Sequence, residues 1–236
     1  MQRIAIHADK TPQTYRYLDS VHAALVNGLT AAGIDGEKLI GRDAQAWTFA
    51  CKGYAKPGGE MAVKSILLST PDEEIGKALL RIKPQDIRKK SSNGDILDFS
   101  RARIRSEQRM PPPGTREACF CFASRFALIG RKAGREKTWF IQSPAQTDFA
   151  AALKAGLDRR AGRELDIRIG IDRLTLATQG APRPVSLRKS GSRRVMIPAF
   201  NMPVSLEGNP EDIAWAYFAG LGAKTHLGFG CPILPN

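Results

Sequence analysis

The stretch NPEDIAWAYFAGLGAKTHLGFGCPIL (residues 209–234) holds the signals that decide the fold. Its first part is typical of a helix, because Asn209 can accept from free backbone N–H groups and Pro210 suits the first helical position. Acidic residues follow in the first turn, where the helix dipole favours them. The helix leads into a glycine-rich segment and then a short apolar strand. Four glycines mark that segment: Gly220, Gly222, Gly228 and Gly230.

The rest of the chain repeats one order of elements on either side of a proline-rich linker, MPPPG (110–114). Hydrophobic periodicity before the linker predicts strands at 2–8, 46–54, 62–70 and 95–105, and helices at 14–33 and 70–82. After the linker it predicts strands at 116–129, 164–178, 193–208 and 229–234, and helices at 145–162 and 209–222. The order strand-helix-strand-strand-helix-strand is ferredoxin-like. We therefore predict an α+β protein of two tandem ferredoxin-like (RRM-like) domains, 1–113 and 114–236, with a glycine-rich loop at 220–230.

The charge of the chain points to an acidic partner. The formal net charge is +13, and arginine outnumbers lysine 22 to 14. Such an excess disfavours a compact fold by self-repulsion, and arginine suits phosphate and stacked bases. Two clusters are candidate RNA contacts, on the strand 95–105 and around a KSGS turn: Arg101, Arg103 and Arg105, then Arg188, Lys189, Arg193 and Arg194. The alternative is that each cluster is a solvated strand or hairpin face.

Cysteine usage and apolar runs bound the remaining classes. The chain has four cysteines without C-x-x-C spacing: Cys51, Cys119, Cys121 and Cys231. We therefore predict that they are buried free thiols, and that the protein holds no metal or other cofactor. No signal peptide is visible, and the most apolar strand is too short to span a bilayer. These features predict a cytoplasmic protein with no membrane partner.

The residues around the glycines carry a family resemblance. The matching positions are Pro198, Pro203, Val204, Gly220, Gly222, Lys224, Gly228, Phe229 and Gly230. In these the segment 197–234 resembles the C-terminal end of the CRISPR repeat-RNA endoribonucleases of the RAMP superfamily, and the divergent type IV form is one candidate. The resemblance implies a metal-independent ribonuclease that binds the repeat hairpin of precursor CRISPR RNA. It also implies 2′-OH attack, a 2′,3′-cyclic phosphate product and retention of the cut RNA.

Two other functions stay open at this stage. The first is a non-catalytic RAMP subunit that holds crRNA beside other Cas proteins in an effector complex, since the chain has only three histidines. The second is a generic basic RNA chaperone, against which the glycine-loop match argues. Cleavage needs a base near the 2′-OH and positive charge near the phosphorus. Side chains that can supply both therefore distinguish a ribonuclease from the two non-catalytic functions.

Candidate catalytic residues gather around the first helix. Many family members place a histidine at or just after that helix, whereas the segment 33–45 contains none. His22 lies on or beside the apolar face, as a packing residue or a catalytic one, and Tyr15 on the same half of the predicted helix could orient it. Lys38 and Arg42 follow as charge-stabilising candidates or as ordinary exposed cations.

The other two histidines have weaker claims. His7 ends the first strand, near the expected junction of the two domains. His226 lies inside the glycine-rich loop, where we expect it to bind RNA or support the loop. In that loop we predict that Lys224 and the glycine N–H groups clamp the RNA backbone.

Overall fold

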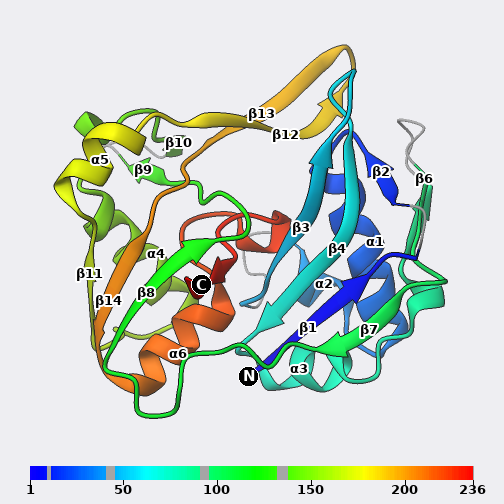
Figure 1. Cartoon of the computed structure of the whole chain (residues 1–236), viewed down its shortest axis with the longest axis horizontal. Coiled ribbons are helices and arrows are strands. Elements are labelled where there is room, and N and C mark those ends of the chain that lie inside the picture. Colours follow the sequence, from blue (N-terminus) through cyan, green and yellow to red (C-terminus); the bar gives the residue numbers. More distant parts are fainter. Residues whose placement is uncertain (10–11, 41–45, 91–95, 132–137, 236) are drawn as a thin grey trace.

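The N-terminal half forms one antiparallel sheet with helices on one face (Figure 1). The computed structural model describes residues 1–9, 12–40, 46–90, 96–131 and 138–235. The sheet has the order β3-β4-β1-β7, built from β1 (Gln2–His7), β3 (Thr48–Ala55), β4 (Met61–Thr70) and β7 (Arg103–Ser106). Helices α1 (Leu18–Ala31) and α3 (Glu73–Leu79) complete a ferredoxin-like unit. Shorter elements are β2 (Gln13–Tyr15), α2 (Gly36–Leu39), η1 (Pro84–Asp86), β5 (Arg88–Lys90) and β6 (Ile96–Asp98).

Three predicted details of this half are wrong. The helix expected over 14–33 begins only at Leu18, because the chain before it pairs with β4 as the short strand β2. The strand expected over 95–105 is two strands, β6 and β7, with a turn between them. The helix expected over 70–82 begins only at Glu73, because its N-cap is Asp72, whose carboxylate accepts from the Ile75 N–H, while the Thr70 hydroxyl accepts from the Asp72 N–H.

The C-terminal half repeats the arrangement. Its sheet has the order β11-β14-β8-β15, built from β8 (Glu117–Phe122), β11 (Ile167–Gly170), β14 (Val204–Gly208) and β15 (Pro232–Ile233). The two helices are α4 (Phe149–Ala161) and α6 (Pro210–Ala219). In both halves the second strand of the unit lies at one edge and the fourth at the other, which confirms the prediction of two tandem ferredoxin-like units. The insertions are β9 (Ile129–Arg131), β10 (Thr138–Phe140), η2 (Pro144–Gln146), α5 (Arg173–Gln179), β12 (Arg183–Ser190), β13 (Arg193–Ala199) and η3 (Thr225–Leu227).

The local signals of α6 hold, and those of the segment 164–178 do not. The Asn209 side chain accepts from the N–H groups of Glu211 and Asp212, as its cap position predicts. The segment 164–178 was expected to be a strand, but only β11 is one. The rest turns into α5, where the Asp172 carboxylate accepts from the Thr175 N–H.

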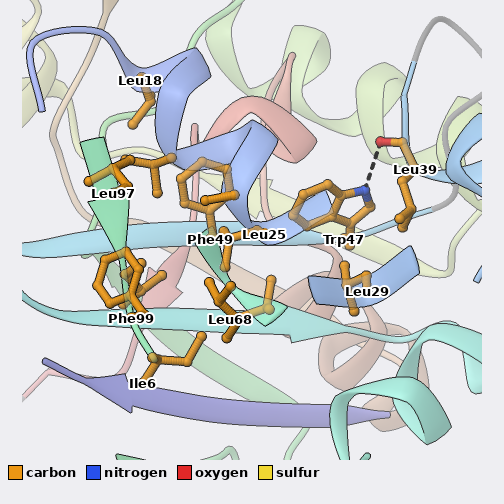
Figure 2. Close-up of a cluster of buried hydrophobic side chains, with 14 of the residues drawn as sticks. Ile6, Leu18, Leu25, Leu29, Leu39, Trp47, Phe49, Leu68, Leu97 and Phe99 are labelled. Carbon is orange, nitrogen blue, oxygen red and sulfur yellow. Dashed lines mark hydrogen bonds between the residues drawn. The ribbon is translucent and has the colours of Figure 1, made fainter. Parts of the chain in front are cut away.

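The core of the N-terminal half lies between α1 and the sheet (Figure 2). Trp47 lies directly before β3 and Phe49 lies within it, and their rings stack with centroids 5.9 Å apart. The indole Nε1 of Trp47 donates to the Leu39 carbonyl oxygen at 3.2 Å, the bond drawn in Figure 2. The β12–β13 hairpin crosses from the C-terminal half to this core (Figure 1) and adds Leu187 and Ile197 to it.

Arg3 joins the two halves. Its buried guanidinium donates to the carbonyl oxygens of Pro232 at 2.9 Å and Tyr217 at 3.2 Å. It also lies over the Tyr217 ring, with Cζ 3.9 Å from the ring centroid. The Ser69 hydroxyl adds a bond to the Phe218 carbonyl oxygen at 3.1 Å. The two halves therefore pack as one body, and the predicted boundary near residue 113 falls in a segment, 107–116, without helix or strand.

Among the described residues, no helix combines the length and apolar character needed to cross a bilayer.

Candidate active site

Two histidines from opposite halves of the chain meet where α1 lies against the glycine-rich loop. The ring centroids of His22, in α1, and His226, in η3, are 5.9 Å apart, with the rings edge to face at 63°. The His22 ring also stacks on Trp47, with centroids 5.6 Å apart and an angle of 17°. Because Trp47 is held by its bond to the Leu39 carbonyl, the His22 ring has a rigid support.

Burial keeps both imidazoles neutral at pH 7. It lowers the pKa of His22 to about 4, against a hydrogen bond to the Leu39 backbone that raises it. The pKa of His226 falls to about 3 through burial first, and then through the charges of His22, Lys224 and Arg160. The Nε2 atom of His22 is buried and has no hydrogen-bond partner among the described residues. A neutral imidazole with an unused ring nitrogen is the protonation state that a general base requires, but this nitrogen faces the protein interior, so the ring must turn before RNA can reach it.

The glycines shape the loop by allowing close packing. Gly228 has φ +87°, and a Cβ there would lie 2.7 Å from the Phe49 ring and 3.1 Å from Leu18. Gly222 has φ +88°, and its Cβ would lie 2.5 Å from the Ala127 carbonyl oxygen. No other residue type could bring the loop this close to α1 and β3.

The glycine N–H groups are used inside the protein, which differs from the expectation of a phosphate-binding loop. The N–H groups of Gly220, Gly228 and Gly230 donate to the carbonyl oxygens of Ala216, Thr225 and Arg125. All four loop glycines, Gly222 included, are buried. In this conformation these three amides are not available to a ligand, whereas the side chains of Lys224 and His226 are partly exposed.

Lys224 has an unusual backbone. Its φ of +59° is left-handed, and it is the only non-glycine residue in the described ranges with a positive φ. Its carbonyl oxygen accepts from the Leu227 N–H, which closes the turn that carries His226. A residue other than glycine rarely adopts this backbone conformation, and backbone strain of this kind is concentrated at functional sites. Lys224 is close enough to His226 for its charge to lower the pKa of that imidazole.

The other candidates at the first helix are spread apart. Tyr15 lies in β2 and not in the helix, because the helix begins after it, and its hydroxyl bonds with Cys51. Burial raises the pKa of Tyr15 well above its usual value. The ammonium of Lys38 pairs with Glu74 at 2.7 Å, and this bond raises the pKa of Lys38. Arg42 lies outside the described residues.

Both basic clusters are exposed, but only the second is arranged as expected. Arg101 lies in the turn before β7, so it does not share a strand face with Arg103 and Arg105. Those two arginines line a pocket of about 360 Å³ together with His7, Ala8 and Asp9. The second cluster is at the tip of the β12–β13 hairpin, with every side chain exposed: Arg188, Lys189, Arg193 and Arg194.

Sequence reasoning missed two residues that build the site. Trp47 supports His22, and no periodic signal sets it apart from an ordinary core residue. Arg160, near the end of α4, binds the glycine-rich loop. A signal for Arg160 did exist, because it lies three residues after the buried Leu157 and four after the buried Gly156, which puts it on the inner face of the helix.

Two ferredoxin-like halves in tandem, with a glycine-rich loop before the last strand, define a RAMP-type protein. The family described as CRISPR associated protein Cas6, C-terminal, matches residues 115–232, half of the chain. The chain therefore belongs to the Cas6 family.

Solved structures agree with this fold over the whole chain. A Cas6-related protein from Pyrococcus furiosus has a TM-score of 0.70 at 19% identity, covering 100% of this chain and 98% of its own. A structure described as a RAMP protein binding different RNA substrates has a TM-score of 0.67 at 18% identity, covering 100% of both chains. A Cas6 product complex has a TM-score of 0.56 at 16% identity, covering 98% of both chains. Curated protein sequences give no match.

Among the described residues, no three His, Cys, Asp or Glu side chains are grouped so that they could hold a metal ion.

Proposed function

We propose that the protein binds the repeat hairpin of precursor CRISPR RNA and cuts it without a metal ion. The observation that carries this proposal is the His22–His226 contact, which brings two neutral imidazoles from the two halves together. Family membership supports it, as do similar structures described as an RNA-binding RAMP protein and as a Cas6 product complex.

The proposed reaction uses three side chains of the site. His22 takes the proton of the ribose 2′-OH while the 2′ oxygen forms a bond to phosphorus. The P–O5′ bond breaks, leaving a 2′,3′-cyclic phosphate. A phosphate beside His226 raises the pKa of that imidazole, so that it can protonate the leaving 5′ oxygen. The Lys224 ammonium, close to His226, stabilises the charge on the phosphorane.

The exposed arginines position the RNA. The hairpin tip, with its four basic side chains, reaches well beyond the C-terminal sheet (Figure 1) and is free to contact phosphates. Arg103 and Arg105 offer a second basic surface on β7. Contacts of this kind bind without regard to sequence and weaken steeply with salt. They also favour retention of the product hairpin, which co-elution of cut RNA with the protein tests.

The experiment uses labelled cognate repeat RNA in EDTA, with a repeat carrying a 2′-deoxy group at the cut site as control. Cleavage of the all-ribose RNA alone supports the proposed reaction. Replacement of the 5′ oxygen at the cut site by sulfur separates the two histidines. A thiolate leaves without protonation, so this substrate restores cutting by His226→Ala and not by His22→Ala.

One observation favours the alternative of a non-catalytic crRNA-binding subunit working beside other Cas proteins. Both imidazoles are partly buried, so RNA reaches them only at their exposed edges. Tight repeat binding with no product between pH 5 and pH 9, in EDTA or in Mg²⁺, would establish that alternative and exclude the ribonuclease.

A further inference from the structure

Arg160 lies beneath the glycine-rich loop and binds it at three points. One guanidinium nitrogen donates to the Gly222 carbonyl oxygen at 2.9 Å and to the Thr225 hydroxyl at 3.0 Å. The other terminal nitrogen donates to the Gly220 carbonyl oxygen at 2.6 Å. These three acceptors lie between the end of α6 and the turn that carries His226. Arg160 thus spans the whole first part of the loop.

The charge of Arg160 has no acidic partner in the described part of the chain. Nearby Arg163 pairs with Asp212, and Lys154 pairs with Asp158 at 2.8 Å. Arg160 contacts only carbonyl and hydroxyl oxygens, and its Nε is buried without a partner in the same ranges. Burial, and then the charge of Arg159, lower the pKa of Arg160 to about 10, so it stays protonated at pH 7.

We infer that Arg160 is a positioning residue, which holds the loop so that His226 meets His22 and supplies a fixed positive charge beneath that pair. Three of its N–H groups bind the loop and its Nε is buried, so it acts on the RNA through His226 and through its charge rather than by contact. A planar guanidinium can reach two carbonyl oxygens at once, which a lysine cannot do with the same geometry. The catalytic part of this inference rests on the proposed function, whereas the geometric part does not.

Two substitutions of Arg160 and one of its neighbour test the inference. Arg160→Gln removes both the positive charge and the planar guanidinium, whereas Arg160→Lys keeps the charge but not the guanidinium. Arg159→Gln is the matched control, because Arg159 is the adjacent residue of α4, carries the same charge and is exposed. Urea denaturation of all three variants first shows that each folds.

The first readout needs no RNA cleavage. The chain has three histidines, so its imidazole protons give three resolvable NMR signals. We expect a nuclear Overhauser effect between the His22 and His226 rings in the wild type and Arg159→Gln, and its loss in both Arg160 variants. The charges facing His226 are those of His22, Lys224 and Arg160. Its titration should therefore move to higher pH in Arg160→Gln, move by less in Arg160→Lys, which keeps the charge, and stay close to wild type in Arg159→Gln.

The second readout is single-turnover cleavage. Displacement of a catalytic group by about 1 Å slows a reaction by about 10²-fold, which is the loss expected for Arg160→Gln at saturating RNA. Arg160→Lys should recover part of the rate, and repeat affinity should hold in both variants. An intact ring contact and an unmoved titration in Arg160→Gln would overturn the inference. If the wild type does not cut, the proposed reaction fails while the NMR result still decides the role of Arg160.

Discussion

The imidazole of His22 contacts the imidazole of His226 across the junction of two domains, so each half of the chain supplies one ring of the pair. We expect His22→Ala and His226→Ala each to slow cleavage of the natural RNA by about 10²–10⁴-fold, the usual contribution of a positioned acid or base. Because the two residues act on one proton-transfer sequence, the double variant should be no slower than the slower single variant. Single-turnover rates measure this, and wild-type cutting by His22→Ala would leave His22 a packing role only.

Stability should fall in mild acid because of the same pair. Both pKa values lie below the ordinary value of 6.5 in the folded state, at about 4 for His22 and about 3 for His226. The unfolded chain therefore binds more protons between pH 6.5 and pH 4, and the free energy of unfolding drops as the pH is lowered through that window. Partial exposure limits the loss to roughly 2–4 kcal/mol. Urea denaturation at pH 7 and pH 5 measures it, and a His22→Gln/His226→Gln double variant should lack it.

Gly228 and Gly58 form a matched pair for the packing of the loop. Both have φ +87°, but a Cβ on Gly228 would meet Phe49 and Leu18, whereas nothing lies within 4 Å of one on Gly58. Alanine at Gly58 should cost about 1 kcal/mol through its backbone conformation alone. Alanine at Gly228 should cost about 1–3 kcal/mol more, through overpacking. Equal losses in thermal denaturation would mean that the loop yields without strain.

The left-handed backbone of Lys224 should lower the stability of the protein, while its ammonium supports cleavage. Lys224→Gly relieves the strain and Lys224→Ala does not, so the glycine variant should be more stable by about 0.5–1 kcal/mol. Both variants lose the ammonium beside His226, and both should cut more slowly at saturating RNA. Denaturation midpoints and single-turnover rates on the two proteins check this. A glycine variant no more stable than the alanine variant would show that the turn carries no strain.

Removal of the Arg3 guanidinium should loosen the two halves. Arg3→Met leaves the carbonyl oxygens of Pro232 and Tyr217 without this donor, and we expect a loss of about 2–4 kcal/mol. Arg105→Met on the same sheet removes an exposed arginine and should change stability by about 0.5 kcal/mol or less. Urea denaturation compares them, and equal effects would remove Arg3 from its joining role.

Much of the fold was predictable because its signals are local. The cap at Asn209 and the spacing of apolar residues depend on neighbours in the sequence, and both half-domains follow from such signals. Competing local chemistry caused the errors. Asp172 caps the helix α5 inside a segment that was expected to be a strand. Tyr15 lies in the strand β2, which precedes the helix that was predicted to include it.

The site was only partly predictable, because it depends on contacts between distant residues. His22 and His226 were each named, but nothing in either segment shows that the rings touch. The same holds for Trp47 beneath His22. Arg159 and Arg160 look alike in the sequence, and only the packing of α4 decides which of them binds the loop.

The β12–β13 hairpin has a consequence for synthesis on the ribosome. Residues 1–106 emerge first, yet the core beneath α1 takes Leu187 and Ile197 from a hairpin made much later. The nascent first half therefore exposes the apolar surface that Leu187 and Ile197 cover in the finished chain, and surface of this kind favours aggregation. The hairpin emerges before the segment that carries His226, so the two histidines can meet only after the hairpin residues have left the ribosome.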